Sequence, residues 1–247
     1  MKNLRKPEEI IINGVSLREL LKSHQKWLDN KESGKQLNLE GADLRYANLK
    51  NVDLAYADLN NAKLENANLE GANLMYTNSK YTNLENANLE NANLEGANLT
   101  YADLTYANLR YVNLKNANLT YADLKYANLV CANLEGANLK NANLRYTDLE
   151  NANLENANLE NTKFYLINLY KVNRKDLFEV GNIGSRNDTT HYFVEDNRVI
   201  CGCFDNTLEE FINKVKDTYD KNSREYMEYM VAIDAFKKYK EMYSKIK

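Results

Sequence analysis

Three side chains near the C-terminus have types that bind transition metals. Cys201 and Cys203 are one residue apart, and His191 precedes Cys201 by ten positions. Zinc prefers thiolate and imidazole ligands, but a closed structural zinc site needs four of them. Free cysteines are more often small, buried core residues. We therefore expect no metal site and no cofactor here.

Strand geometry also weakens the metal hypothesis. The stretches 190–194 and 198–203 alternate around Asp196-Asn197, which is typical of a β-hairpin. If these two residues form the turn, Tyr192 lies opposite Cys201 and His191 points to the other face. A different turn length would exchange the faces, so a metal site is disfavoured without being excluded.

No other motif indicates catalysis. The chain has two histidines, and it lacks G-x-S-x-G, H-E-x-x-H and a glycine-rich phosphate loop. The polar segment Gly184–Asp188 could hold a small ligand, but such segments are more often plain loops. We expect no catalytic residues and a protein that is not an enzyme.

Outward-facing tyrosines recur at intervals of 20 residues, beside arginine and lysine. One column holds Tyr81, Tyr101 and Tyr121, and Tyr111 stands apart. Contiguous exposed aromatics often mark an interface, although stacked rings could also only stabilise the backbone. The candidate partner surface comprises Tyr81, Tyr101, Tyr121, Tyr106, Tyr126, Tyr146, Tyr111, Arg110, Lys125 and Arg145.

A five-residue repeat must position these columns. From Leu39 to Leu169 every fifth residue is Leu, and among these 27 positions only Ser79 and Phe164 differ. A small residue stands two positions before each Leu, and Asn or Asp usually stands directly before it. A period of five fits neither a helix nor a strand. It fits a chain that turns a corner every five residues.

Four such corners make a square coil of 20 residues, in which Leu and the small residue both point inward. Successive coils would stack like parallel strands about 4.8 Å apart, giving about 6.75 coils and a rod of roughly 32 Å. Ser79 interrupts a column of leucines, which predicts a local bulge or a widened turn.

The unit A-(N/D)-L-x-x resembles the pentapeptide repeat family, over about 130 of the 247 residues. The resemblance implies a right-handed quadrilateral parallel β-helix and no single activity. The segment IGSRNDTTHYFVEDNRVICGCF, followed by TLEEF, is similar to a tail of phage- and prophage-borne pentapeptide proteins. That similarity implies no activity.

The sequence predicts a mainly β fold in three regions. The N-terminal cap contains a capping box, Ser16 to Glu19, and an amphipathic helix that ends near Asp29 and covers the first coil. Bulky residues from Phe164 to Ile167 predict a plug at the other end. The expected regions are 1–36 for the cap, 37–170 for the β-helix, and 171–247 for a small α+β domain with a β-hairpin and two helices.

Charge and composition restrict the partners. Residues 38–170 carry a net charge of −6, and a basic band crosses the middle. Duplex DNA carries one charge per ~1.7 Å, so a mimic 32 Å long would need roughly 19 negative charges. No apolar run approaches the ~20 residues that span a bilayer, and three cysteines form no disulfide framework. We expect a cytoplasmic protein without a membrane partner.

The favoured function is a non-enzymatic scaffold that binds another protein. The first alternative is a DNA mimic that binds a type II topoisomerase such as gyrase, as some pentapeptide repeat proteins do. The second is single-stranded nucleic-acid binding on the tyrosine columns, where stacking and basic residues would favour it but the acidic flanks would not. A nucleic-acid partner is therefore not expected. A homodimer through the C-terminal domain is a further expectation.

Overall fold

The structure is a computed structural model that describes residues 4–30, 32–164, 169, 172–174, 177–183, 188–194, 196–201 and 204–246. The chain divides into two compact units, which are treated separately. The first, called the repeat unit, comprises Met1–Lys163 with Ile167–Asn173. The second, called the C-terminal unit, comprises Phe164–Leu166 with Arg174–Lys247.

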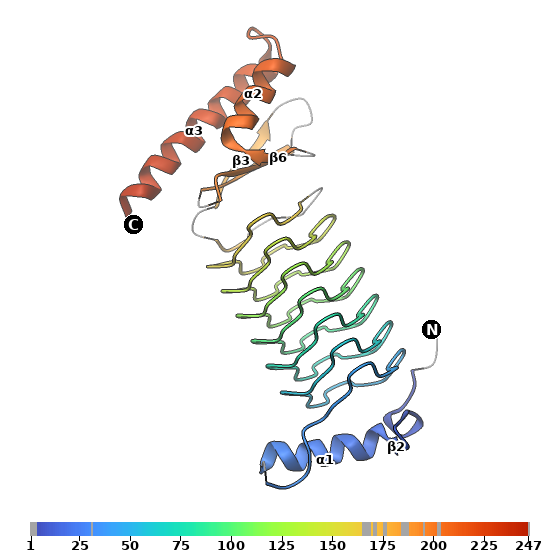
Figure 1. The fold of residues 1–247 in the computed structure, drawn as a ribbon. Coiled ribbons are helices and arrows are strands. Elements are labelled where there is room, and N and C mark those ends of the chain that lie inside the picture. The colour runs from blue at the N-terminus through green and yellow to red at the C-terminus, as the bar shows by residue number, and fades with distance from the viewer. Residues whose placement is uncertain are drawn as a thin grey trace. The chain divides into compact units, whose positions relative to one another are not determined.

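The repeat unit is a stack of square coils (Figure 1). Each Asn or Asp before a Leu forms a parallel bridge with the residue 20 positions later, for example Asp103 with Asp123. The backbone N–H of Leu104 donates to the carbonyl of Asp123 at 2.7 Å, and this bond recurs along the unit. A 20-residue coil is therefore the true structural period, as the five-residue spacing predicts.

Leucine and the small residue fill the interior of each coil. Leu104 is fully buried and Ala102 is 1% exposed. Larger residues at the small position loosen the turn before them: the Ala102 N–H donates to Leu99 at 3.0 Å, but the corresponding bond of Val112 measures 3.3 Å and that of Thr147 measures 3.4 Å. The core therefore has room for two inward side chains per face only when one of them is small.

The bulge predicted at Ser79 is wrong, because the ladder runs through this coil without interruption. The Ser79 N–H donates to the Asn98 carbonyl at 2.8 Å, as a leucine N–H would. Ser79 is buried, and its hydroxyl lies 3.0 Å from that of Thr77, which also donates to the Leu74 carbonyl. Two threonines at small positions, Thr77 and Thr82, offset the volume that the serine lacks.

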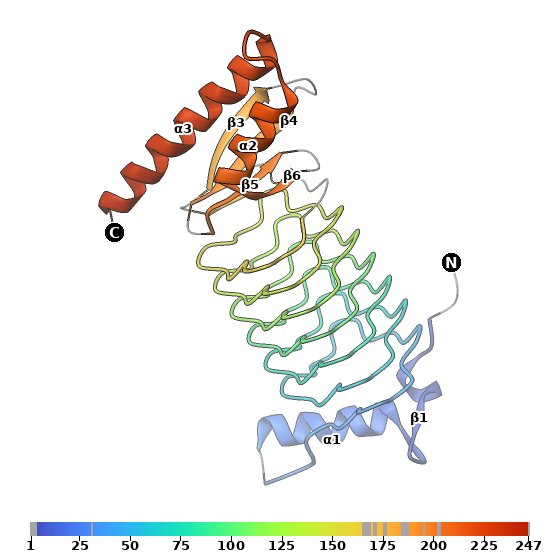
Figure 2. The same cartoon turned by 45° about the horizontal axis from the view of Figure 1, so that its top comes forward.

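A helix covers the first coil of the repeat unit (Figure 2). Helix α1, Leu17–Asp29, begins with the predicted capping box between Ser16 and Glu19. His24 faces the coil, and its Nδ1 accepts the backbone N–H of Leu37 at 3.1 Å. The short elements before it are the 3₁₀ turn η1, Pro7–Glu9, and the paired strands β1, Ile11–Ile12, and β2, Val15–Ser16.

The C-terminal unit contains, within its described residues, an antiparallel sheet in the order β3-β4-β5-β6 and two helices (Figure 2). Tyr192, Phe211 and Phe236 are among the residues that fill the core between sheet and helices. The elements are β3 Leu177–Ile183, β4 Asp188–Phe193, β5 Arg198–Cys201, β6 Phe204–Thr207, α2 Leu208–Thr218 and α3 Arg224–Ile246.

Two sequence-based expectations about this unit need correction. The hairpin is the middle of a sheet of four strands, because β3 and β6 flank it. The turn spans four residues, Val194 to Asn197, and Thr190 rather than Tyr192 lies opposite Cys201. This shift by two residues preserves the faces of the strands, since side chains alternate with a period of two.

The predicted plug at the end of the repeats can be followed only at Phe164, because residues 165–168 lie outside the described residues. Phe164 belongs to the C-terminal unit, where its ring stacks on Phe193 at 6.1 Å between centroids. Its backbone N–H donates to Asp205, which also pairs with Arg198. The bulky side chain is thus part of that unit's own packing.

Candidate interaction surface

Every corner of the repeat unit is a tight turn with one residue in the left-handed region. At a representative corner the Ala102 N–H donates to the Leu99 carbonyl, and the third residue, Tyr101, has a φ of 60°. A hydrogen-bonded turn with positive φ at its third residue only is a type II turn, which favours Gly or Asn there. Asn and Gly occupy many corners, for example Asn141 and Gly136.

Tyrosine is the unexpected occupant of these corners. In the described part of the chain, ten residues with positive φ are tyrosines, including Tyr106 and Tyr121. A left-handed residue other than glycine costs roughly 1–3 kcal/mol, least for Asn and Asp. The backbone therefore gives no reason to place a bulky aromatic residue at a corner.

The corner tyrosines form ladders along the coil axis. In the first ladder, Tyr81, Tyr101 and Tyr121, successive ring centroids are 5.1 and 4.9 Å apart. In the second ladder, Tyr106, Tyr126 and Tyr146, both spacings are 4.7 Å. The rings remain between 36% and 53% exposed. Each ladder is consequently a rigid strip that presents ring edges to solvent.

Sequence reasoning missed a third ladder, formed by Tyr56 and Tyr76. Their ring centroids are 5.4 Å apart, and Trp27 of α1 meets the Tyr56 ring edge-on at 6.4 Å. The period of 20 would have revealed this pair, because both residues occupy the same corner. Its contact with Trp27 gives this ladder a structural role in holding the lid.

Three cations of the candidate surface lie beside the ladders. The Lys125 ammonium is 4.9 Å from the centroid of Tyr126, and the Arg110 guanidinium is 5.3 Å from that of Tyr111. Within the described residues, Arg110, Lys125 and Arg145 form no ion pair. The other two lysines of the basic band are neutralised across coils, Lys115 by Glu135 at 3.0 Å and Lys140 by Glu160 at 2.8 Å.

The face between the first and second ladders has carboxylates that serve the backbone. Asp103 Oδ1 accepts the N–H of Thr105 at 2.9 Å, and Asp123 Oδ1 accepts that of Lys125 at 3.0 Å. Such bonds hold the turns in place. The unpaired charges of this region are accordingly the cations, not the carboxylates.

The structure separates the residues of the metal hypothesis. His191 Nε2 lies 3.2 Å from a carboxylate oxygen of Glu179 on β3, and the Thr190 hydroxyl lies 3.1 Å from Cys201 Sγ on the other face. Cys203 and residues 184–187 of the predicted polar loop lie outside the described residues. Among the residues that the structure does describe, no group of three or more His, Cys, Asp or Glu side chains could hold a metal ion.

His24 is the other histidine, and it has a structural position. Burial between α1 and the first coil lowers the pKa of its imidazole, while the Ala55 backbone and the Asp53 charge act in the opposite direction. Its ring stacks on Trp27 at 5.6 Å. A neutral histidine that accepts a backbone N–H stabilises the lid and performs no chemistry.

The repeat geometry has its counterpart in known proteins. A model of the family described as pentapeptide repeats matches in eight copies, over residues 36–71, 53–88, 80–116, 97–136 and 132–169. The chain belongs to the pentapeptide repeat family. Membership implies the right-handed β-helix, and the stacked square coils agree with it. No curated protein sequence matches the chain.

Solved pentapeptide repeat structures resemble this one. HetL, involved in heterocyst differentiation regulation in the cyanobacterium Nostoc, is 26% identical over 60% of this chain and 89% of its own, with a TM-score of 0.34. Rfr23 from the cyanobacterium Cyanothece is 28% identical over 62% and 95%, with a TM-score of 0.23. QnrB1, a plasmid-mediated fluoroquinolone resistance protein, is 18% identical over 56% and 79%, with a TM-score of 0.42.

These matches do not support the resemblance of the C-terminal segment to phage-borne proteins, because the family model ends at residue 169. As for membranes, the helices in the described part of the chain are all too short or too polar to cross one.

Proposed function

We propose that this pentapeptide repeat protein is a non-enzymatic scaffold that binds a partner protein through its first and second tyrosine ladders. One observation carries the proposal: exposed tyrosines occupy left-handed corners at which Asn or Gly fits better. An aromatic pair contributes about 0.5–1.5 kcal/mol, and the left-handed backbone costs about 1–3 kcal/mol per tyrosine. Stacking therefore offsets the strain at best, and stability alone does not account for the ladders.

The ladders suit a flat protein surface. Their tyrosines are held by their neighbours in the column, so they lose little side-chain entropy on binding. Tyrosine also gives a large amphipathic contact area with few rotatable bonds, which is why it is enriched at binding surfaces. Arg110, Lys125 and Arg145 form no ion pair within the described residues, so the partner surface should carry carboxylates opposite them.

Ring spacing argues against binding of single-stranded nucleic acid. A base that stacks between two rings needs them about 6.8 Å apart, twice the ~3.4 Å of base stacking. Rings in the first and second ladders are 4.7–5.1 Å apart. Their faces are thus covered by one another, and only the terminal rings could stack with a base.

The charge of the repeats argues against the gyrase-binding DNA mimic in the same way. A net charge of −6 over residues 38–170 is far below that of a duplex of equal length, and a basic band interrupts it. Inhibition of gyrase supercoiling by micromolar protein would overturn this part of the proposal.

Matched ladder variants test the proposal. The double variant Tyr101→Asn, Tyr126→Asn keeps residues that suit left-handed corners and removes the middle ring of both ladders. The control, Tyr56→Asn with Tyr76→Asn, makes the same change in the third ladder. We expect a partner captured from cell extract and identified by mass spectrometry to be lost from the first variant and kept by the second.

A charge reversal of Lys125 and Arg145 to Glu should also abolish capture. Capture that survives both the ladder variant and the charge reversal would overturn the proposal. So would a ladder variant that loses the partner only because it unfolds, which circular dichroism on the same sample reveals.

A further inference from the structure

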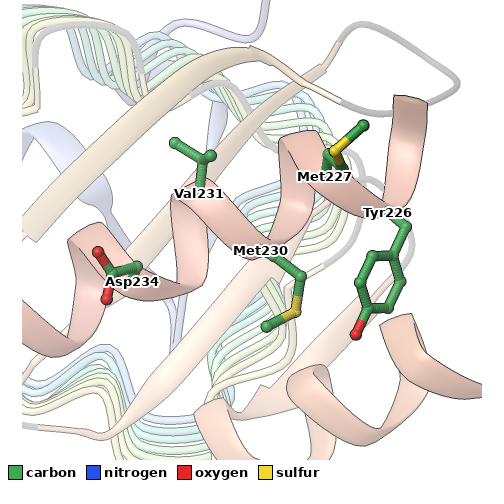
Figure 3. A pocket seen from close by; sticks show the side chains of 5 residues that line it. All are labelled: Tyr226, Met227, Met230, Val231 and Asp234. Carbon is green, nitrogen blue, oxygen red and sulfur yellow. The ribbon is translucent and has the colours of Figure 1, made fainter. Parts of the chain in front are cut away.

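The C-terminal unit exposes apolar side chains on one helix. In its described residues the exposed large hydrophobic side chains are Met227, Val231 and Met242, at 58%, 70% and 59%, and all three belong to α3. The first two line a shallow pocket of about 350 Å³ together with Tyr226, Met230 and Asp234 (Figure 3).

These residues form one stripe along the helix. At 100° per residue, Met227, Val231, Asp234, Lys238 and Met242 fall within an arc of about 80°. The stripe is about 22 Å long, from Met227 to Met242, at 1.5 Å per residue. In Figure 3 the side chains of Met227 and Val231 project from the same side of α3, while Met230 and Tyr226 point to the other side.

The opposite side of α3 is already occupied. Tyr229, Ile233 and Phe236 are buried in the core against the sheet and α2. The stripe is thus a second apolar face, which the fold of its own unit leaves uncovered. An amphipathic helix of a monomer would carry polar residues there.

Charge along α3 indicates what covers the stripe. Residues 224–235 carry three carboxylates and one guanidinium, for a net −2, whereas residues 236–246 carry four lysines and one glutamate, for a net +3. A second α3 that runs antiparallel would set the acidic half of each helix against the basic half of the other. A parallel arrangement would set like charges together.

We propose that α3 is the interface of a homodimer, in which the α3 helices of two copies pair antiparallel about a two-fold axis level with Phe236. Asp234 then lies opposite Lys238 of the second copy, twice by symmetry. Val231 lies within one residue step of Met242 of the second copy on either side. The apolar contacts thus flank a central set of four alternating charges, which is the self-complementary pattern that a two-fold interface requires.

The interface is small, so the dimer should be weak. One helix pair buries less than the roughly 800 Å² per partner of a standard interface, and we expect a dissociation constant of about 10–100 µM. This proposal does not depend on the tyrosine ladders, whose variants should dimerise normally.

Sedimentation of the full chain over a concentration series tests the dimer. The wild-type chain should change from monomer to dimer across the micromolar range, and Val231→Glu should raise the dissociation constant at least about tenfold. A wild-type chain that stays monomeric at about 1 mM overturns the proposal. So does a dimer that Val231→Glu leaves intact.

Charge exchange tests the orientation. Asp234→Lys alone and Lys238→Asp alone each place like charges opposite each other, so each variant should be monomeric. An equimolar mixture of the two restores both opposite-charge pairs and should form a heterodimer, as should the homodimer of the double variant. Circular dichroism confirms that α3 persists without its internal Asp234–Lys238 pair. If the mixture stays monomeric although both variants are folded, the antiparallel register is wrong.

Discussion

The repeat unit and the C-terminal unit bury their side chains by different rules. In the repeat unit a residue's environment follows from its position in the five-residue motif, so Leu84, Leu104 and Leu124 are interchangeable members of one buried column. In the C-terminal unit Phe236 and Tyr192 meet because three elements pack together, and no other residue has the same surroundings. Periodic packing makes a residue's role readable from its number, and irregular packing does not.

Core truncations should show this contrast most strongly. Leu84→Ala, Leu104→Ala and Leu124→Ala should each lower the free energy of unfolding by about 2–5 kcal/mol, because each leaves a cavity in an equivalent place. In the C-terminal unit, Phe236→Ala should cost about 3–5 kcal/mol and a change at the partly buried Phe178 clearly less. Denaturant titrations followed by circular dichroism measure all five.

A spread among the three leucine variants as wide as that between the two phenylalanine variants would break the comparison.

The interrupted leucine column offers a test inside the repeat unit. Ser79→Leu alone should destabilise the protein by about 1–3 kcal/mol, because Thr77 and Thr82 already occupy part of the space. Replacing those two threonines by Ala together with Ser79→Leu restores the common motif and should recover the loss. Thermal melting of the single and triple variants decides it. A single variant more stable than the wild type would show that the site is underpacked.

The lid histidine predicts an acid-sensitive contribution to stability. Burial lowers the pKa of His24, so the unfolded chain binds a proton more readily than the folded one. Stability should therefore fall as the pH drops from about 6.5 toward the folded pKa, and be fully present above 6.5. His24→Gln, which can still accept the Leu37 N–H, should remove this component of the pH profile. A profile with the same slope in both proteins would contradict it.

The smallest effect on stability is expected at the ladders. Tyr101→Asn should change the free energy of unfolding by less than about 1 kcal/mol, because the lost stacking is offset by a residue better suited to positive φ. Tyr101→Ala should be worse than Tyr101→Asn, since alanine lacks both the ring and the tolerance for the left-handed region. Matched denaturant titrations compare the two. A loss of several kcal/mol for Asn would make the ladders structural.

The coils, the buried leucines and the stacked columns could be predicted from sequence, because each depends only on a spacing of five or 20. Ser79 was misjudged because its compensation depends on threonines at neighbouring small positions. The turn after β4 was placed wrongly because Asp196-Asn197 is a good turn pair, and nothing local shows that the turn begins at Val194. Strand β6, Phe204–Thr207, was missed because FDNT is short and polar.

The candidate surface was only partly readable. The alignment of the first and second ladders follows from the period, but their left-handed corners do not, although Asn and Gly at the same position are the signal for them. Lys115 and Lys140 could not be told apart from Lys125 without knowing which glutamate lies in the next coil. The exposed stripe of α3 was hidden, because only the packed structure shows which face the core uses.

The square coil also has a consequence for how such a gene can change. The core reads the chain modulo five, and the surface reads it modulo 20. A duplication of 20 residues would add one storey and leave every column aligned. Insertion of a single pentapeptide between Tyr101 and Tyr121 would keep every leucine inside, yet it would turn the later corners by a quarter and move Tyr121 onto the corner of Tyr106. Frame shifts of that kind would scramble the exterior while the interior registers no change.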